Sequence, residues 1–315
     1  MRTLCQYHCQ PNAISPNRTP VSARHSNFTG LALAAVGAVA FGTLAIFAKF
    51  AFERGAESVP LLASRFATAA ILLLAYHLST GRPLRFGSGA VRMMILGGIG
   101  YAFESTLFFV ALQHAPAAVV GLVFYSYPLW TTLLALAVGL DSYRHRIALA
   151  LVAGTAGVSL IFSFRSTHLT GPLFALAAAI AVALYLIAVQ KASGGMDPFN
   201  VALWTATGAA LSLTVVAAVT SQTLPLAAFP FAGALGLVTA IAFVFLYGSI
   251  NRIGSSRSSI AMMLEPVTTV ILAAIFLGES LTVRIVLGAI LVVAALPLLA
   301  SAPAQPSAQK RIDLL

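Results

Sequence analysis

The amino-acid sequence predicts an all-α membrane protein of ten transmembrane helices, arranged as two inverted five-helix repeats. Three observations predict this fold class: an apolar composition, ten apolar runs of spanning length, and a motif repeated at a fixed offset. Hydrophobic residues make up 59% of the 315-residue chain, charged residues only 8%, and the mean hydropathy is +0.94. Soluble domains carry about 25% charged residues, so this chain could not cover a water-exposed surface. We therefore expect the bilayer to be the solvent for most of the chain.

Ten apolar runs are long enough to cross a bilayer. A hydrocarbon core about 30 Å thick needs roughly 17–25 residues of helix. The predicted spans are residues 31–50, 59–78, 91–112, 116–139, 146–164, 172–190, 199–220, 229–250, 257–277 and 283–300. Turn residues separate them, as at 79–83 and 193–198. The runs are continuously apolar and do not alternate, so helices are expected and barrel strands are not.

The polar ends of the chain are predicted to be cytoplasmic tails. The expected organisation is a disordered tail at 1–29, five-helix repeats at 30–165 and 170–300, and a tail at 301–315. Residues 1–29 contain no acidic residue, which also fits a cleaved targeting peptide or an over-extended start. Cys5, His8 and Cys9 are too few ligands for a tetrahedral metal site. We expect no metal and no cofactor.

The basic residues predict the orientation of the spans. With a cytoplasmic N-terminus, thirteen basic residues fall inside, four fall outside, and Arg65 remains within a span. Those inside are Arg2, Arg18, Arg24, Arg82, Arg85, Arg92, Arg144, Arg146, Lys191, Arg252, Arg257, Lys310 and Arg311, and those outside are Lys49, Arg54, Arg165 and Arg284. This excess favours cytoplasmic N- and C-termini. The net charge of +10 forms no basic stripe, so a nucleic-acid partner is not expected.

An offset of 138 residues aligns two segments of the chain without a gap. Pro128 falls on Pro266, Asp141 on Glu279, Ser142 on Ser280 and Arg146 on Arg284. Each unit contains five spans, and because five is odd, the second unit enters the membrane from the opposite side. Inverted repeats of this kind recur in secondary transporters, whose substrate sites lie between the halves.

The repeated segments also resemble a known family. The motifs are Leu264-Glu265-Pro266-Val267, then Leu277-Gly278-Glu279-Ser280-Leu281-Thr282 and a last helix containing glycine. The first half matches through Lys49, Arg65, Ala111-Leu112 and Ala115-Pro116-Ala117. Over about residues 30–300 the chain resembles the EamA family of the drug/metabolite transporter superfamily. The resemblance implies ten helices, cytoplasmic termini, and export of amino acids or other metabolites across the bacterial cytoplasmic (inner) membrane. Tyr127 stands where the second repeat has Glu265, so a symmetric pair of carboxylates is not expected.

Three ionisable residues lie deep within predicted spans: Arg65, Glu104 and Glu265. At about 1.5 Å per residue, Arg65 and Glu104 lie roughly 8–12 Å below the same boundary, so we expect them to pair. The pair could be structural, or Arg65 could present its planar donor fork to a carboxylate substrate. Glu265 has no evident cation at its depth. It either carries a proton or binds an amine, or it only accepts hydrogen bonds from neighbouring hydroxyl groups.

Prolines and aromatic residues add candidates for gating and stacking. Pro128 and Pro266 lack an N–H, so kinks that free the carbonyls of Phe124 and Met262 are expected. Matched kinks suggest gates, or they serve packing alone. Tyr101, Tyr127 and Trp130 are candidates to stack on a planar substrate, or they face lipid or the core.

The most consistent function is a secondary transporter that exports a small metabolite such as an amino acid. It would work by alternating access around a cavity lined by spans 2, 3, 4, 8 and 9, with proton coupling through Glu265. The alternatives are an importer or exchanger of a nucleoside, sugar or phosphorylated sugar, and a scaffold that transports nothing. No nucleophile–base pair or nucleotide loop is evident, so an enzyme is not expected. A homodimer is left open.

Overall fold

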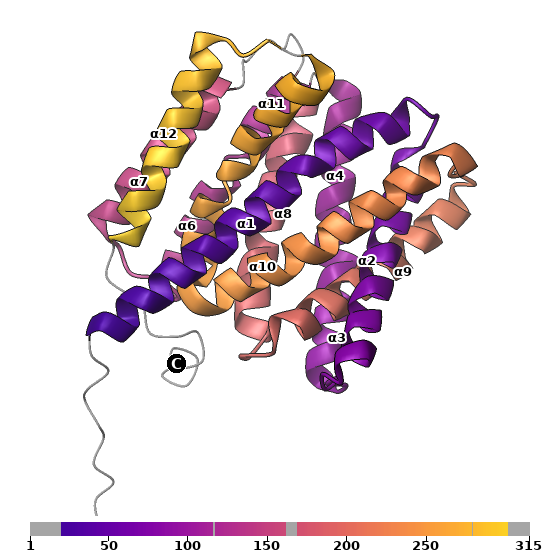
Figure 1. Cartoon of the computed structure of the whole chain (residues 1–315), viewed down its shortest axis with the longest axis horizontal. Coiled ribbons are helices and arrows are strands. Elements are labelled where there is room, and N and C mark those ends of the chain that lie inside the picture. The colour runs from indigo at the N-terminus through magenta and orange to yellow at the C-terminus, as the bar shows by residue number, and fades with distance from the viewer. Residues whose placement is uncertain (1–19, 116, 162–168, 279, 302–315) are drawn as a thin grey trace, which may run out of the picture.

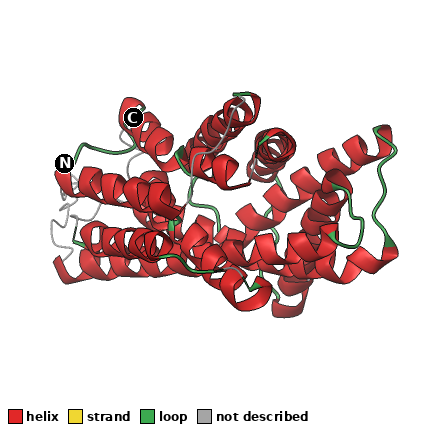
Figure 2. Ribbon diagram, turned by 90° about the horizontal axis from the view of Figure 1, so that it is seen from above, coloured by secondary structure: helices red, strands yellow, loops and turns green. Residues whose placement is uncertain are grey.

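The computed structural model describes residues 20–115, 117–161, 169–278 and 280–301, and these residues form helices joined by short loops without any strand (Figures 1 and 2). The helices are α1 (Pro20–Phe52), α2 (Ser58–Thr80), α3 (Ser88–Ile95), the π-helical η1 (Leu96–Tyr101), α4 (Ala102–His114), α5 (Ala117–Phe124), α6 (Tyr127–Ala137), α7 (His145–Ile161), α8 (Thr170–Ala192), α9 (Pro198–Val219), the 3₁₀ turn η2 (Leu226–Ala228), α10 (Phe229–Ala261), α11 (Leu264–Leu277) and α12 (Val283–Ala300).

The helices account for the ten predicted spans. Eight helical segments are long and apolar enough to cross a membrane, and the shorter apolar helices at His145–Ile161 and Leu264–Phe276 supply the fifth and ninth spans. The third span is continuous through α3, η1 and α4, whereas the fourth is divided into α5 and α6. The predicted fold class, an all-α membrane protein with two repeats, is confirmed.

The first helix is longer than the sequence predicted. α1 begins at Pro20, so residues 20–29, expected in the disordered tail, are helical. A proline suits the first turn of a helix because its missing N–H has no helical partner there. The remainder of the predicted tail, residues 1–19, lies outside the described residues, as do residues 302–315 of the C-terminal tail.

Equivalent helices of the two halves run antiparallel. Near the start of α7, Arg146 donates a hydrogen bond to the carbonyl of Ser301, just after α12. Near the start of α12, Arg284 donates to the carbonyl of Ser159, in the last turn of α7, at 3.1 Å. Each helix therefore begins beside the end of the other, with the two helices side by side in Figure 1. Because Arg146 and Arg284 are equivalent at the offset of 138 residues, their halves are inverted.

The packing between helices follows the same symmetry between the two halves. α1 packs against α10, the long helix of the second half, and α8 packs against η1 and α4 of the first half. α1 also contacts α11 as α8 contacts α6, while α2 packs on α9. Exchanging the halves converts α1–α10 into α8–α4, converts α1–α11 into α8–α6 and leaves α2–α9 unchanged, which is the behaviour expected of a pseudo-two-fold axis.

The fourth and ninth spans are broken at matching positions. α5 ends at Phe124 and α6 begins at Tyr127, while α10 ends at Ala261 and α11 begins at Leu264. Pro128 and Pro266 therefore lie in the first turn of a new helix, where a proline removes no helical hydrogen bond. At each proline a two-residue turn with right-handed backbone angles separates the two helices. The carbonyl of Met262 is not left free, because it accepts from the backbone N–H of Glu265 at 2.9 Å.

A single glycine turns the chain between the eighth and ninth spans. Gly254 has φ 83° and ψ 166°, inside the residue range of α10. Non-glycine residues rarely adopt this conformation, so the direction of the backbone changes here without a loop. The segment after Gly254 leads directly to the break before α11. Discontinuous helices of this kind line the substrate sites of inverted-repeat transporters.

Candidate functional site

Three helices bring one guanidinium and two carboxyl groups to the centre of the molecule. Arg65 lies on α2, Glu104 on α4 and Glu265 in the first turn of α11. The Nε of Arg65 donates to the hydroxyl of Thr239, on α10, at 2.6 Å. Its guanidinium carbon lies 4.9 Å from the ring centroid of Phe66. The charge of Arg65 is within electrostatic range of both carboxyl groups. We call Arg65, Glu104, Glu265 and Thr239 the central polar cluster.

The expected ion pair between Arg65 and Glu104 does not form. The structure gives an ion pair within 4.0 Å between Arg82 and Asp197 but none between Arg65 and Glu104. Glu104 is 5% exposed and accepts a hydrogen bond from the neighbouring Ser105 hydroxyl at 3.1 Å. The prediction assumed a regular helix, whereas η1 precedes Glu104. A π-helical turn inserts residues relative to an α-helix and changes the face on which later residues lie.

Glu265 has a partner that the sequence analysis missed. Tyr125, a buried residue between α5 and α6, lies within electrostatic range of the Glu265 carboxyl group. The two broken spans thus meet across the repeats, since Tyr125 belongs to the first half. The start of α11 also favours an anion, because the helix dipole is positive at its N-terminus. Pro128, three residues after Tyr125, was the sequence signal that could have drawn attention to Tyr125.

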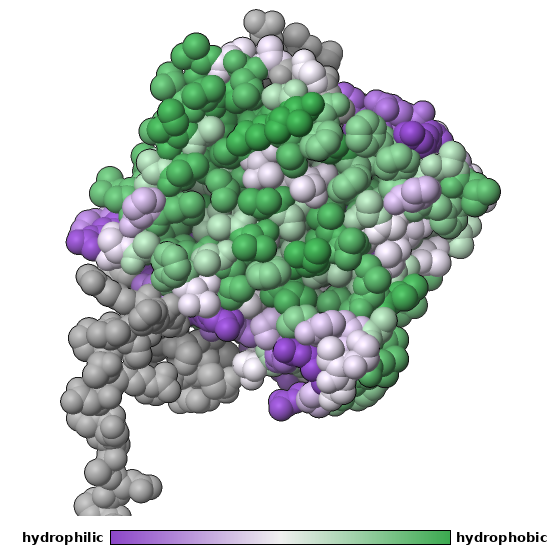
Figure 3. Space-filling model, in the orientation of Figure 1, coloured by the Kyte–Doolittle hydropathy of each residue, from purple (hydrophilic) through white to green (hydrophobic). Residues whose placement is uncertain are grey.

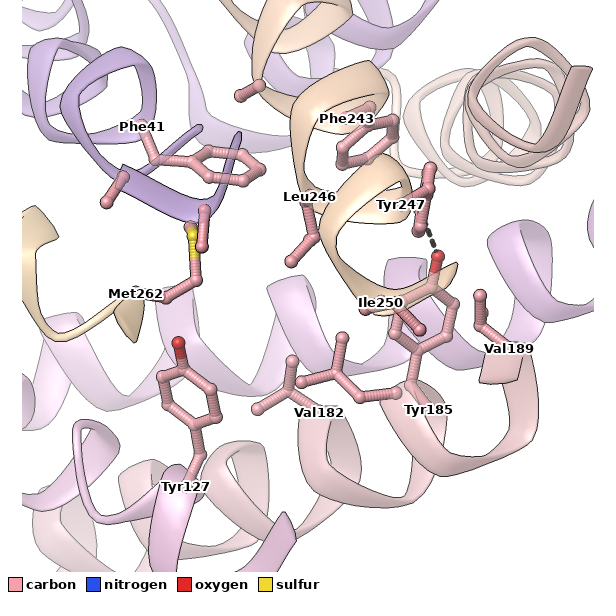
Figure 4. Packing of buried hydrophobic residues seen from close by; sticks show 14 of the residues in the cluster. Phe41, Tyr127, Val182, Tyr185, Val189, Phe243, Leu246, Tyr247, Ile250 and Met262 are labelled. Carbon is pink, nitrogen blue, oxygen red and sulfur yellow. Dashed lines mark hydrogen bonds between the residues drawn. The ribbon is translucent and has the colours of Figure 1, made fainter. Parts of the chain in front are cut away.

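Aromatic side chains surround the central polar cluster. The ring of Tyr101 packs edge-on against Phe66, Tyr185 and Phe243, with centroid distances of 5.5, 5.3 and 5.2 Å. Tyr185, on α8, and Tyr247, on α10, share a hydrogen bond between their hydroxyl groups (Figure 4). Helix α8, the sixth span, was not among the spans expected at the site.

The other two aromatic candidates differ in their surroundings. Tyr127 is buried, 5.5 Å from the ring of Phe124, and lies within electrostatic range of Glu265. Trp130 is partly buried and donates its indole N–H to the hydroxyl of Ser126, four residues earlier, at 3.2 Å. Tyr127 is therefore part of the surroundings of the cluster, whereas the hydrogen bond of Trp130 stays close to its own helix.

A second buried polar group includes an arginine that the sequence analysis counted among the basic residues on the cytoplasmic side. Arg257 is 1% exposed and donates to the side-chain oxygen of Asn27, on α1, at 3.2 Å. The hydroxyl of Ser256 lies 3.1 Å from that of Thr132 on α6, and the backbone N–H of Ser255 donates to Gln190 on α8 at 2.6 Å. We call these residues the serine–arginine cluster. It joins both halves at the end of the molecule where α1 begins. The hydroxyl-rich run at 255–259 was its sequence signal.

A cavity of about 640 Å³ lies between α1, α2, α10 and the start of α9. No member of the central polar cluster lines it. For metals, the described part of the chain contains no group of three His, Cys, Asp or Glu side chains that could hold an ion. Cys5, His8 and Cys9 lie outside that part.

Comparison with known proteins gives a consistent result. The model of the EamA-like transporter family matches residues 28–163 and 169–301. The uncharacterized transporter YcbK of Bacillus subtilis (strain 168) is 27% identical over 277 residues, covering 80% of this chain and 86% of the relative. The uncharacterized transporter YyaM of the same organism is 28% identical over 243 residues, covering 71% and 78%.

One solved structure, described only as "Crystal structure of protein", shares the fold. Its TM-score is 0.73 at 21% sequence identity, and the match covers 88% of this chain and 96% of that chain. The likeness extends to both repeats and concerns the fold alone.

Proposed function

Since the chain belongs to the EamA-like transporter family, we propose that it exports a small metabolite such as an amino acid by alternating access. It is a multi-pass membrane transporter, and the proposal places it in the bacterial cytoplasmic membrane with both termini in the cytoplasm. The excess of basic residues on one side of the predicted spans supports this orientation.

The charge composition of the central polar cluster carries the proposal. Arg65 and Glu104 come from the first repeat and Glu265 from the second, so the charges lie at the interface of the halves. A free amino acid carries a carboxylate and an ammonium group. The planar guanidinium of Arg65 suits the carboxylate, and the two carboxyl groups suit the ammonium. A phosphorylated solute would meet two carboxyl groups and one cation, which makes it a poorer fit.

The broken helices provide the moving parts in the proposed mechanism. The interruptions before Pro128 and Pro266 let α6 and α11 change angle relative to α5 and α10 without breaking continuous helices. The serine–arginine cluster holds the halves together at the end where α1 begins. Opening on that side separates Arg257 from Asn27, and contacts at the opposite end then close. The central polar cluster is exposed to one side at a time.

Glu265 couples this cycle to protons. Its carboxyl group lies within electrostatic range of Arg65 and Tyr125. In the proposed exchange, the ammonium group of the substrate leaves as a proton binds Glu265, so that the buried site keeps its charge balance. Burial of an uncompensated charge is unfavourable, which links the two events.

Substrate flux tests the proposal. Cells with and without the gene are compared for resistance to each amino acid in excess, and the purified protein is then assayed in proteoliposomes with labelled substrate. We expect Glu265→Gln and Arg65→Ala to abolish resistance and flux. Glu57→Gln is the control, because Glu57 is an exposed carboxyl group at the start of α2. Wild-type flux through both site variants, inserted at normal levels, would overturn the site assignment.

The response to an imposed pH gradient tests proton coupling separately from substrate transport. In proteoliposomes, wild-type protein should drive net substrate movement when an opposing proton gradient is imposed, and a protonophore should abolish it. A Glu265→Gln variant that retains gradient-driven movement would show that protons bind elsewhere.

A further inference from the structure

The cavity beside the central polar cluster is a groove with an apolar body. Its lining comes chiefly from α2 and α10, and includes Leu72, Leu237, Ile241 and Val244. Leu72 is 37% exposed, Ile241 is 40% exposed and Leu237 is 51% exposed, so the groove is bordered by side chains that face the surrounding lipid. We call it the α2–α10 groove. Figure 3 shows one face of the molecule as largely hydrophobic, with hydrophilic residues at its lower, left and upper-right edges.

One end of the groove is polar and carries two guanidinium groups. Arg82 and Arg252 line it together with Asp197. The Nη1 of Arg82 lies 3.1 Å from the carboxylate of Asp197, and its guanidinium carbon lies 4.3 Å from the ring centroid of Phe199. Arg252 donates to the carbonyl of Gly248 at 3.0 Å. Two cations and one anion leave this end with an excess positive charge.

The dimensions of the groove suit a lipid chain. Along α10 the lining extends from Leu237 to Arg252, which corresponds to about 22 Å of helix. An extended acyl chain has a similar length. The basic end lies on the side of the molecule where α2 ends and α9 begins, the predicted cytoplasmic side. Basic pockets between helices on that side attract anionic lipid headgroups.

We propose that the α2–α10 groove binds one anionic phospholipid of the phosphatidylglycerol type. Its phosphate lies at Arg82 and Arg252, and one acyl chain lies along α10 between Leu72 and Ile241. The pairing with Asp197 and the stacking on Phe199 hold Arg82 in place before the lipid arrives, which lowers the entropy lost on binding. This inference concerns a site separate from the central polar cluster and does not depend on the transported substrate.

Lipid titration of the purified full-length protein in detergent tests the proposal. Phosphatidylglycerol and phosphatidylcholine with identical acyl chains are added in turn, and bound lipid is counted by native mass spectrometry. We expect one phosphatidylglycerol to be retained about fivefold more tightly than phosphatidylcholine, which corresponds to about 1 kcal/mol. Arg252→Gln should abolish this preference.

A matched variant distinguishes the groove from general basic charge. Arg92 lies at the same end of the molecule and donates to the carbonyl of Ser88, four residues earlier, as Arg252 does to Gly248. It does not line the groove. Arg92→Gln should therefore keep the preference for phosphatidylglycerol. Equal losses in the two variants, or no preference in the wild-type protein, would overturn the proposal.

Two further experiments identify the occupant: a variant that fills the groove, and competition with inorganic phosphate. Ile241→Trp places a large apolar side chain in the groove at an already exposed position, so it should weaken retention of both lipids without preventing folding. Inorganic phosphate at millimolar concentration should not displace phosphatidylglycerol, because it cannot use the apolar body. Displacement by phosphate, or normal lipid retention in Ile241→Trp, would contradict a lipid site.

Discussion

The hydroxyl group of Thr239 accepts a hydrogen bond from a guanidinium group that lies deep in a spanning helix. Arg65 lies within α2, and a charge at the centre of such a helix costs roughly 2.5–3.5 kcal/mol on insertion scales. Thr239 is fully buried, donates to the carbonyl of Leu235 at 2.7 Å, and accepts from Arg65. Its hydroxyl therefore has two functions, one within α10 and one between the two halves of the molecule.

Thr239→Val removes the acceptor and leaves the shape of the side chain nearly unchanged. We expect a loss of about 1.5–3 kcal/mol in the free energy of unfolding, because the hydrogen bond involves a charged group. Thr207→Val is the control, since Thr207 also donates to the carbonyl four residues earlier, at 2.8 Å, on α9. Unfolding in mixed micelles with increasing denaturing detergent measures the free energy of unfolding of both variants. Equal losses would mean that the bond from Arg65 contributes nothing to stability.

The candidate residues show which parts of a site can be predicted from sequence. Arg65, Glu104 and Glu265 could be identified because an ionisable residue is rare in an apolar run, and the structure brings them within electrostatic range. Tyr125 and Arg257 were missed, although Pro128 and the hydroxyl-rich run at 255–259 lay beside them in the sequence, because their importance comes from partners on distant helices. The pairing of Arg65 with Glu104 was wrong because no pattern in the apolar run indicated a π-helical turn.

Close packing of small residues fixes α7 against α12. A Cβ atom added to Gly288 would lie 2.5 Å from the carbonyl oxygen of Gly157 and 3.0 Å from the backbone nitrogen of Ile161. These contacts involve backbone atoms, which no side-chain rotation can relieve. In a membrane, helix association depends strongly on such close approach, since lipid and side chains are equally apolar.

Gly288→Ala should separate these two helices. We expect a destabilisation of about 1–3 kcal/mol, the usual range for overpacking. Gly233→Ala, in α10, is the control, because a Cβ atom there meets nothing within 4 Å. That control should be neutral or stabilising by about 0.5–1 kcal/mol, since alanine favours helix over glycine. Thermal unfolding in detergent compares them, and a Gly288→Ala protein as stable as Gly233→Ala would contradict the packing.

At the scale of helices, apolar length predicted the spans well and predicted their internal geometry poorly. The ten runs correspond to the ten helical crossings because bilayer thickness determines the length of a span. The breaks between α5 and α6 and before α11 were expected only as kinks, since a proline restricts its own backbone but does not fix where the preceding helix ends. The early start of α1 at Pro20 was missed because polar residues 20–29 extend beyond the apolar run.

For the whole molecule, the antiparallel arrangement of equivalent helices has a topological consequence. Arg146 and Arg284 are equivalent by sequence, and each contacts the end of the other's helix. The loops that precede α7 and α12 must therefore lie on opposite membrane faces. Ser142 and Ser280, which are also equivalent and both exposed, mark these two loops.

Labelling of introduced thiols tests this arrangement. The chain contains only Cys5 and Cys9, so a background with both replaced by Ser carries no other thiol. In that background, Ser280→Cys should react with a membrane-impermeant maleimide in intact cells, and Ser142→Cys only after permeabilisation. Reaction of both from one face would refute the inverted repeat. If Ser142→Cys reacts in intact cells and Ser280→Cys only after permeabilisation, the inverted repeat stands but the orientation is reversed. The helix contacts support the inverted repeat, whereas the basic residues support the orientation.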